Sequence, residues 1–206
     1  MNAWFALFLT FAAVAGAEPR ITYTKEFPGS SPAYIAITVE RSGDVAYKES
    51  KDEEPLRCKL SGPETDEIFG LAQKLEYFSR PLESNLKVAK MGLKTFRFED
   101  GATSRETKFN YSLDPEAQAL NDWFERIAES EQSFIRLERA VKYDKLGVNE
   151  ALLLLQISYE KSRLVGPEQF LPLLDRVAKN DSYLHMARER SAALADRIRG
   201  KAPKAE

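Results

Sequence analysis

The spacing of apolar side chains changes along this 206-residue chain, and the change constrains the fold more than any other feature. In the N-terminal half apolar residues alternate with polar ones, as in half-buried β-strands. From Ser130 onward they recur at helical spacing, with no alternating segment. We therefore expect an α+β fold: an antiparallel sheet with two covering helices, followed by an all-α C-terminal segment of three to four helices.

The first two strands should form a hairpin. Their apolar residues, which should share the buried face, are Ile35, Ile37, Val39, Val45 and Tyr47. A two-residue loop would place Ile37 opposite Lys48, an apolar residue against a charged one. A three-residue loop, Arg41-Ser42-Gly43, instead pairs Val39 with Val45, and Gly43 supplies the left-handed residue that such a loop needs. We predict the three-residue loop.

Turn and cap residues divide the rest of the N-terminal half. A strand over 56–60 precedes a helix opened by Gly62-Pro63, because proline fits the first helical turn. A second β region contains Phe96 and Phe98, with a turn at Asp100-Gly101 and an open register. Asp114 caps the second covering helix. The core faces of the two helices should carry Ile68, Leu71, Ala72, Leu75, Leu120, Trp123, Phe124 and Ile127.

Three helical runs are predicted after this, over 132–145, 149–164 and 167–198. The last should break into two helices, with a new cap at Asn180-Asp181. Whether residues 115–145 form one helix or two stays open. The implied organisation is a signal peptide over 1–17, an α+β domain over 18–128, a helical domain over 129–200 and a disordered tail over 201–206.

The N-terminus carries an export signal pattern. Residues 3–17 are apolar apart from Thr10, and about 15 residues of helix span only about 22 Å, short of the ~30 Å hydrocarbon core. Ala15-Gly16-Ala17 is a small-x-small cleavage site. We predict cleavage after Ala17, a periplasmic or secreted protein and no stable membrane span after cleavage. Because no Lys or Arg precedes the apolar run, an uncleaved anchor is the alternative.

A single cysteine, Cys58, cannot form an internal disulfide. Arg57 and Lys59 flank it, so the alternation places Cys58 on one strand face with Leu56 and Leu60. We predict that Cys58 is a buried, unreactive core residue.

Catalytic and metal-binding motifs are few. The one histidine, His185, is expected to serve packing or lie on the surface, and no zinc or Cys-His motif is present. Two S-x-x-K matches, Ser84 to Lys87 and Ser158 to Lys161, lack the companion motifs of penicillin-binding enzymes. We expect no cofactor and no metal. The net charge of -2, with nearly equal acids and bases, gives no reason to expect nucleic acid as a partner.

One segment stands out by charge. Arg80, Lys87, Lys90, Lys94 and Arg97 lie close together in the sequence, and Glu83 is the acid among them. Positive charge on an irregular connection can meet an acidic protein, lipid headgroups or polysaccharide. The alternative is a solvated strand edge protected by lysines. We take Lys87, Lys90 and Lys94 as the candidate partner-binding residues.

Two resemblances add little about function. Gly29-Ser30-Ser31-Pro32-Ala33-Tyr34 and the strands after it resemble an uncharacterised family of exported bacterial domains that opens with C-x-G-x-C-P-x-Y. Phe27 and Ser31 stand where that family has its two cysteines, so a disulfide or metal role of that pair is absent here. The C-terminal pattern from Leu173 to Ile198 looks like one helix pair of a HEAT repeat, and a single pair more often packs as an αα-hairpin.

The expected function is that of a non-catalytic exported binding module. Its partner would be an unknown protein or a polyanionic partner in the cell envelope. A hydrolase of unfamiliar motif and a helical-repeat docking protein are the alternatives. Apolar residues left exposed on the last two helices would favour the docking protein.

Overall fold

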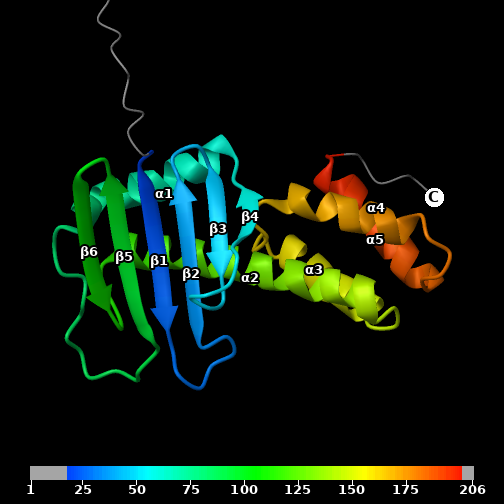
Figure 1. The fold of residues 1–206 in the computed structure, drawn as a ribbon, viewed down its shortest axis with the longest axis horizontal. Helices are drawn as coiled ribbons and strands as arrows, with labels where there is room; N and C mark the ends of the chain where they lie inside the picture. Colours follow the sequence, from blue (N-terminus) through cyan, green and yellow to red (C-terminus); the bar gives the residue numbers. More distant parts are fainter. Residues whose placement is uncertain (1–17, 201–206) are drawn as a thin grey trace, which may run out of the picture.

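A six-stranded antiparallel sheet and five α-helices make up residues 18–200, the part of the chain that the computed structural model describes (Figure 1). The strands run in the order β4-β3-β2-β1-β5-β6. Their bounds are Arg20–Glu26 (β1), Tyr34–Glu40 (β2), Asp44–Lys48 (β3), Leu56–Lys59 (β4), Leu93–Asp100 (β5) and Thr103–Phe109 (β6). The predicted α+β class is confirmed. The predicted signal peptide with its cleavage site, and the predicted tail, lie outside the described residues.

The central strand β1 was not predicted. It pairs with β2 on one side and β5 on the other. Ile21 and Tyr23 are its buried apolar residues, and Thr22 and Thr24 alternate with them. Two apolar residues give only a short alternating pattern, and their burial comes from the covering helix α2 (Pro115–Tyr143), on whose Phe124 the Tyr23 ring stacks.

The first hairpin has the predicted register. Val39 pairs with Val45 and Ile37 with Tyr47, across the loop at residues 41–43. Gly43 has a φ of 90°, and a Cβ there would lie 2.9 Å from the Leu60 carbonyl oxygen, so glycine is required twice over. The second hairpin, of open register in the sequence, pairs Asp100 with Thr103 across a two-residue turn.

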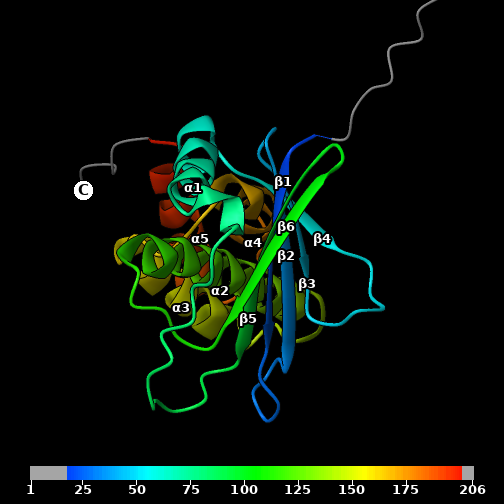
Figure 2. The same ribbon diagram turned by 90° about the vertical axis from the view of Figure 1, so that its left-hand side faces the viewer.

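The first covering helix, α1 (Gly62–Lys74), begins as predicted. Ser61 and Glu64 form a capping box, and Pro63 lies in the first turn. A short 3₁₀ segment, η1 (Glu76–Phe78), follows and has positive φ at all three residues. Phe78 is buried there and packs its ring against Phe96. Figure 2 shows α1 and α2 on the same side of the sheet, so one sheet face is covered by helices.

The second covering helix, α2, is a single helix from Pro115 to Tyr143. Asp114 caps it as predicted, with its carboxylate accepting hydrogen bonds from the backbone N–H groups of Glu116 and Ala117. The N-terminal part of α2 packs on the sheet through Phe124 and its neighbours, and the C-terminal part packs on the later helices through Leu137. The expected boundary between residues 128 and 129 falls inside this helix.

The C-terminal segment contains α3 (Val148–Glu160), a short 3₁₀ segment η2 (Pro167–Phe170), α4 (Leu171–Ala178) and α5 (His185–Ile198). The run over 167–198 is broken as predicted, but Asn180-Asp181 is not the cap. The N-cap of α5 is Leu184, and the Asn180 side chain accepts a hydrogen bond from the Ser182 backbone N–H in the connecting turn. The helix pair that resembles a HEAT unit corresponds to α4 and α5, which pack on each other.

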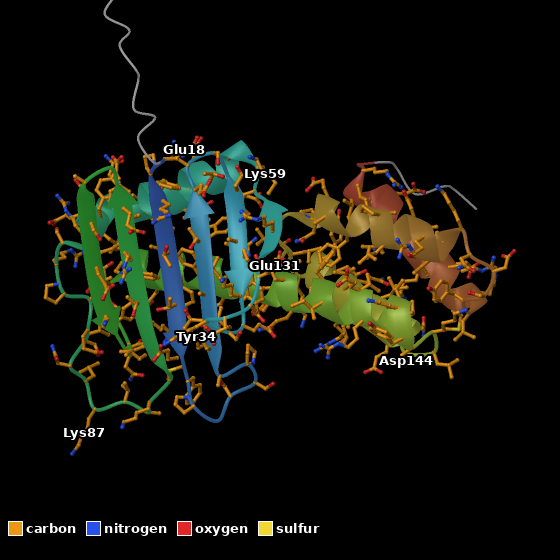
Figure 3. All side chains as sticks on the ribbon, in the orientation of Figure 1. Glu18, Tyr34, Lys59, Lys87, Glu131 and Asp144 are labelled. Atoms are coloured by element: carbon orange, nitrogen blue, oxygen red, sulfur yellow. The ribbon has the colours of Figure 1, made fainter. Side chains whose placement is uncertain are left out.

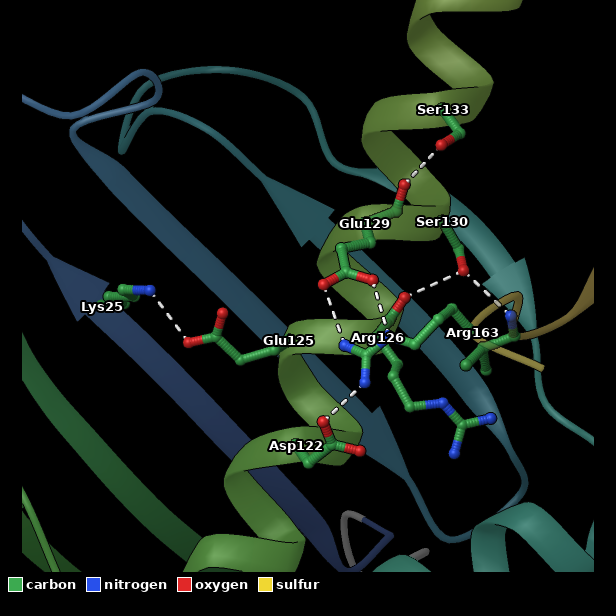
Figure 4. A network of polar contacts seen from close by, with 9 residues as sticks. Lys25, Asp122, Glu125, Arg126, Glu129, Ser130, Ser133 and Arg163 are labelled. Atoms are coloured by element: carbon green, nitrogen blue, oxygen red, sulfur yellow. Dashed lines mark hydrogen bonds and ion pairs between the residues drawn. The ribbon is translucent and has the colours of Figure 1, made fainter. Parts of the chain in front are cut away.

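Polar contacts attach the connection after α3 to the middle of α2 (Figure 4). The Arg163 guanidinium donates to both carboxylate oxygens of Glu129, at 2.8 and 2.9 Å, and to Asp122 at 2.7 Å. The buried Ser130 hydroxyl accepts from the Val165 backbone N–H at 2.9 Å. The helical segment is therefore joined to the same helix that covers the sheet.

Candidate functional site

The predicted partner-binding lysines lie around a loop at one end of the sheet. Residues 81–92, between η1 and β5, have no regular secondary structure, and residues 85–91 are all exposed. Lys87 and Lys90 belong to this exposed stretch, and Figure 3 shows Lys87 pointing away from the rest of the protein. These two positions match the expected exposure.

Lys94 differs from the other two and is not an exposed contact residue. It is the second residue of β5 and is only 6% exposed. Its side chain lies on the covered sheet face with Phe96 and Phe98, and its Nζ donates to the Asn110 carbonyl oxygen at 2.9 Å. Burial, followed by the nearby Lys25, lowers the pKa of Lys94. Lys94 therefore stabilises the end of β6 at Asn110, next to the loop, rather than facing solvent.

Asn110 fixes the loop to the end of β6. Its side-chain oxygen accepts from the Met91 N–H at 2.7 Å, and its side-chain nitrogen donates to the Ala89 carbonyl oxygen at 3.0 Å. Its backbone N–H donates to the Glu83 carboxylate at 2.6 Å, and this bond is the main cause of a lowered pKa of Glu83. One asparagine therefore holds the C-terminal end of the exposed stretch and the Glu83 side chain just before its N-terminal end.

The two arginines of the charged segment have acidic partners. Arg80 pairs with Asp114 at 2.5 Å, and the Arg97 guanidinium pairs with Glu106. The Glu83 carboxylate accepts a hydrogen bond from the Asn110 backbone N–H. Within residues 18–200, neither Lys87 nor Lys90 forms an ion pair, so both carry unneutralised positive charge at this end of the sheet.

Exposed apolar side chains lie beside the two lysines in the sequence and on the adjoining loop between β1 and β2, and sequence reasoning missed them. Phe27 is 37% exposed, Leu86 52%, Val88 42%, Met91 52% and Leu93 47%. A Cβ on Gly92 would lie 3.0 Å from the Phe27 Cβ, so the loop between β1 and β2 adjoins the exposed stretch. We call the set of Phe27, Leu86, Lys87, Val88, Lys90, Met91 and Leu93 the sheet-end surface. The run Leu86-Lys87-Val88-Ala89-Lys90-Met91 was the available signal, because apolar residues alternate there with lysines on a predicted loop.

A second group of polar residues lies between the sheet and the helical segment. Glu131, in the middle of α2, is 1% exposed, and its Oε1 accepts from the Gln169 side chain at 2.8 Å. Its Oε2 is buried and makes no hydrogen bond of ordinary geometry. Burial raises the pKa of Glu131. Burial also raises the pKa of the adjacent Cys58 thiol, and the Glu131 carboxylate adds to that shift.

Cys58 is on the predicted strand face but is half-buried rather than buried. It packs at the margin of the sheet core, as does Leu56. Since the reactive species is the thiolate, the raised pKa agrees with the expected low reactivity.

The remaining candidates do not assemble a reactive site. His185 is exposed at the start of α5, with its Nε2 3.1 Å from Glu189. The Ser84 hydroxyl bonds Glu83 and the Leu86 N–H, and among the described residues neither S-x-x-K serine is hydrogen-bonded to its lysine. A hollow of about 440 Å³ beside α1 contains Arg41 and Asp66, which pair with each other at 2.7 Å. No group of three or more metal-ligating side chains occurs within the described part of the chain.

No family model matches the chain, and no curated protein matches it significantly. Over residues 18–200, none of the helices is both long enough and apolar enough to cross a bilayer.

Proposed function

We propose that this protein is an exported, non-catalytic binding module that captures a polyanionic partner in the cell envelope through its sheet-end surface. Residues 1–17 would serve as the signal peptide, cleaved after Ala17. An intact mass beginning at Glu18 in the exported protein supports this part, and a mass that retains residues 1–17 contradicts it.

One observation carries the binding proposal: Lys87 and Lys90 are exposed without acidic partners on a loop that Asn110 holds at Ala89 and Met91 and, before its exposed stretch, at Glu83. A loop that is already ordered loses less conformational entropy on binding than a mobile one. The neighbouring arginines are neutralised by Asp114 and Glu106, so the two lysines are the exposed cations of this segment that have no acidic partner among the described residues.

Retention on immobilised heparin, a soluble model of a polyanion, tests the proposal. The double variant Lys87→Glu/Lys90→Glu should elute at clearly lower salt than wild type. Lys161→Glu/Lys179→Glu, two exposed lysines of the helical segment, is the control, because it changes the net charge equally. Equal losses in the two variants would mean that only net charge matters, and the sheet-end surface would be wrong.

A docking role of the helical segment is the second candidate function. On the last two helices, α4 and α5, the exposed large apolar residue is Met186, 60% exposed, so the expected criterion is met by a single side chain. On the preceding helix α3, Leu153 is 41% and Ile157 37% exposed, one turn apart on the same helix face. An apolar helix face of this kind suits a protein partner. A photo-crosslinker placed at Ile157 should then capture a partner in cells, whereas one placed at Val88 should not.

A further inference from the structure

We infer that the anionic partner of the sheet-end surface is the surface of a lipid bilayer. Leu86, Val88 and Met91 would enter the headgroup region, and Lys87 and Lys90 would pair with lipid phosphates. The inference rests on the proposed function and specifies its partner.

The composition of the exposed stretch is the first argument. A polyanion such as a polysaccharide needs cationic and polar contacts, and it gives no reason for three apolar side chains to stand in water beside the lysines. Contiguous exposed apolar surface in a water-soluble protein usually marks an interaction site. Apolar side chains interleaved with lysines match the two layers of a membrane interface, hydrocarbon below and phosphate above.

The shape of this end of the protein is the second argument. The loop before β5 and the loop between β1 and β2 project beyond the strand ends at the same end of the sheet (Figures 1 and 2). A projecting tip can enter a deformable lipid surface without a matching groove. Glu18, the first described residue, lies at the opposite end of the sheet from Lys87 (Figure 3).

The fixed backbone is the third argument. Asn110 holds the N–H of Met91 and the carbonyl of Ala89, and the backbone N–H of Ser84 donates to the Tyr111 carbonyl at 2.8 Å. Asn85 and Gly92, with positive φ, bend the chain at the two ends of the stretch. The backbone polar groups near the tip are therefore partly satisfied within the protein, which lowers the cost of placing them at a membrane interface.

Vesicle co-sedimentation tests the inference, with a chain that begins at Glu18, because the apolar residues 1–17 would bind lipid by themselves. Vesicles of phosphatidylcholine and phosphatidylglycerol in equal amounts should bind the protein, and pure phosphatidylcholine vesicles should bind it far less. Juxtamembrane lysines contribute about 1 kcal/mol each, so losing two should weaken binding about 30-fold, and Lys87→Glu/Lys90→Glu should do at least that.

The apolar residues separate lipid insertion from simple charge attraction. Leu86→Ser/Val88→Ser/Met91→Ser should weaken vesicle binding by at least about tenfold, since burying part of a large apolar side chain is worth on the order of 1 kcal/mol, yet it should keep heparin retention. Leu153→Ser/Ile157→Ser is the matched control and should bind vesicles like wild type. A Met91→Trp variant should show a blue-shifted emission on binding, because its indole leaves water.

The outcomes separate the two proposals. Heparin retention without vesicle binding overturns the bilayer inference and leaves the proposed function standing. Unchanged vesicle binding of the triple serine variant, or no emission shift of Met91→Trp, also overturns the inference. Absence of both heparin and vesicle binding overturns the proposed function itself.

Discussion

Lys94 on β5 donates from its Nζ to the carbonyl oxygen of Asn110, 2.9 Å away, and so connects the covered sheet face to the residue that holds the exposed loop. A buried ammonium group is tolerated here because this carbonyl accepts from it and the Phe109 ring lies 5.9 Å away. Lys94, which sequence reasoning grouped with Lys87 and Lys90, thus stabilises the protein instead of presenting an exposed charge.

Replacing Lys94 should therefore affect stability. Lys94→Met keeps most of the apolar stem but leaves the Asn110 carbonyl without this donor, so we expect a loss of about 1–3 kcal/mol in the free energy of unfolding. Lys87→Met/Lys90→Met should change it by less than about 0.5 kcal/mol, as is usual at exposed sites. Urea unfolding measures both. If Lys94→Met unfolds like wild type yet loses heparin retention, Lys94 is a contact residue after all.

The attachment of the loop through Glu83 should depend on pH. Its folded pKa is lowered, chiefly by the Asn110 N–H, so its contribution to stability is present above the unfolded pKa of about 4.3 and is lost as pH falls through the folded pKa. Glu83→Gln should be less stable than wild type at neutral pH, and the difference should shrink in acid. Urea unfolding across this range gives the difference, and a gap that stays constant with pH would contradict the assignment.

Cys58 should react slowly in the folded protein. Its raised pKa lowers the thiolate fraction tenfold for each unit, so a thiol reagent at mildly alkaline pH should label it at least about tenfold more slowly than in urea. We also expect no disulfide-linked dimer on a non-reducing gel. Fast labelling of the native protein would show that the strand face holding Cys58 opens readily to solvent.

Local patterns predicted those elements whose partners are close in the sequence. The pairing of Val39 with Val45 follows from matching apolar faces across one short loop. Asp114, followed by a proline, is a local N-cap signal that needs no distant contact to predict the start of α2. The same alternation predicts that Lys94 is buried, because it stands two residues before Phe96 on one strand and so shares its face. Its charge was instead taken as a sign of exposure.

The features that sequence reasoning missed depend on distant contacts. β1 has two buried apolar residues, Ile21 and Tyr23, and needs β2 and β5 on either side to be recognised as the centre of the sheet. The continuity of α2 was left open because its two halves pack on different cores, which no local window reveals. Glu131 stands four residues after Ile127 and so falls on the core face of α2, but the sequence does not show that Gln169, distant in the chain, bonds its carboxylate there.

Glu131 should make the junction between the sheet and the helical segment less stable as pH rises. Its folded pKa is raised by burial, so the native state holds the proton more tightly than the unfolded state does. Stability therefore falls as pH rises from the unfolded pKa of about 4.3 through the folded pKa, and the cost then stays constant.

A neutral isostere should remove that cost. Glu131→Gln keeps an oxygen for Gln169 and places an amide beside Cys58, so it should raise the free energy of unfolding at mildly alkaline pH by about 1–3 kcal/mol, the usual penalty of a buried unsatisfied polar group. Near pH 4, where the carboxyl of wild type is protonated, the two proteins should unfold alike. Glu138→Gln, an exposed acid on the same helix, makes the same charge change and should have little effect at either pH. A destabilised Glu131→Gln at alkaline pH would instead mean that the carboxylate is satisfied in the native state, with the Cys58 thiol donating to Oε2.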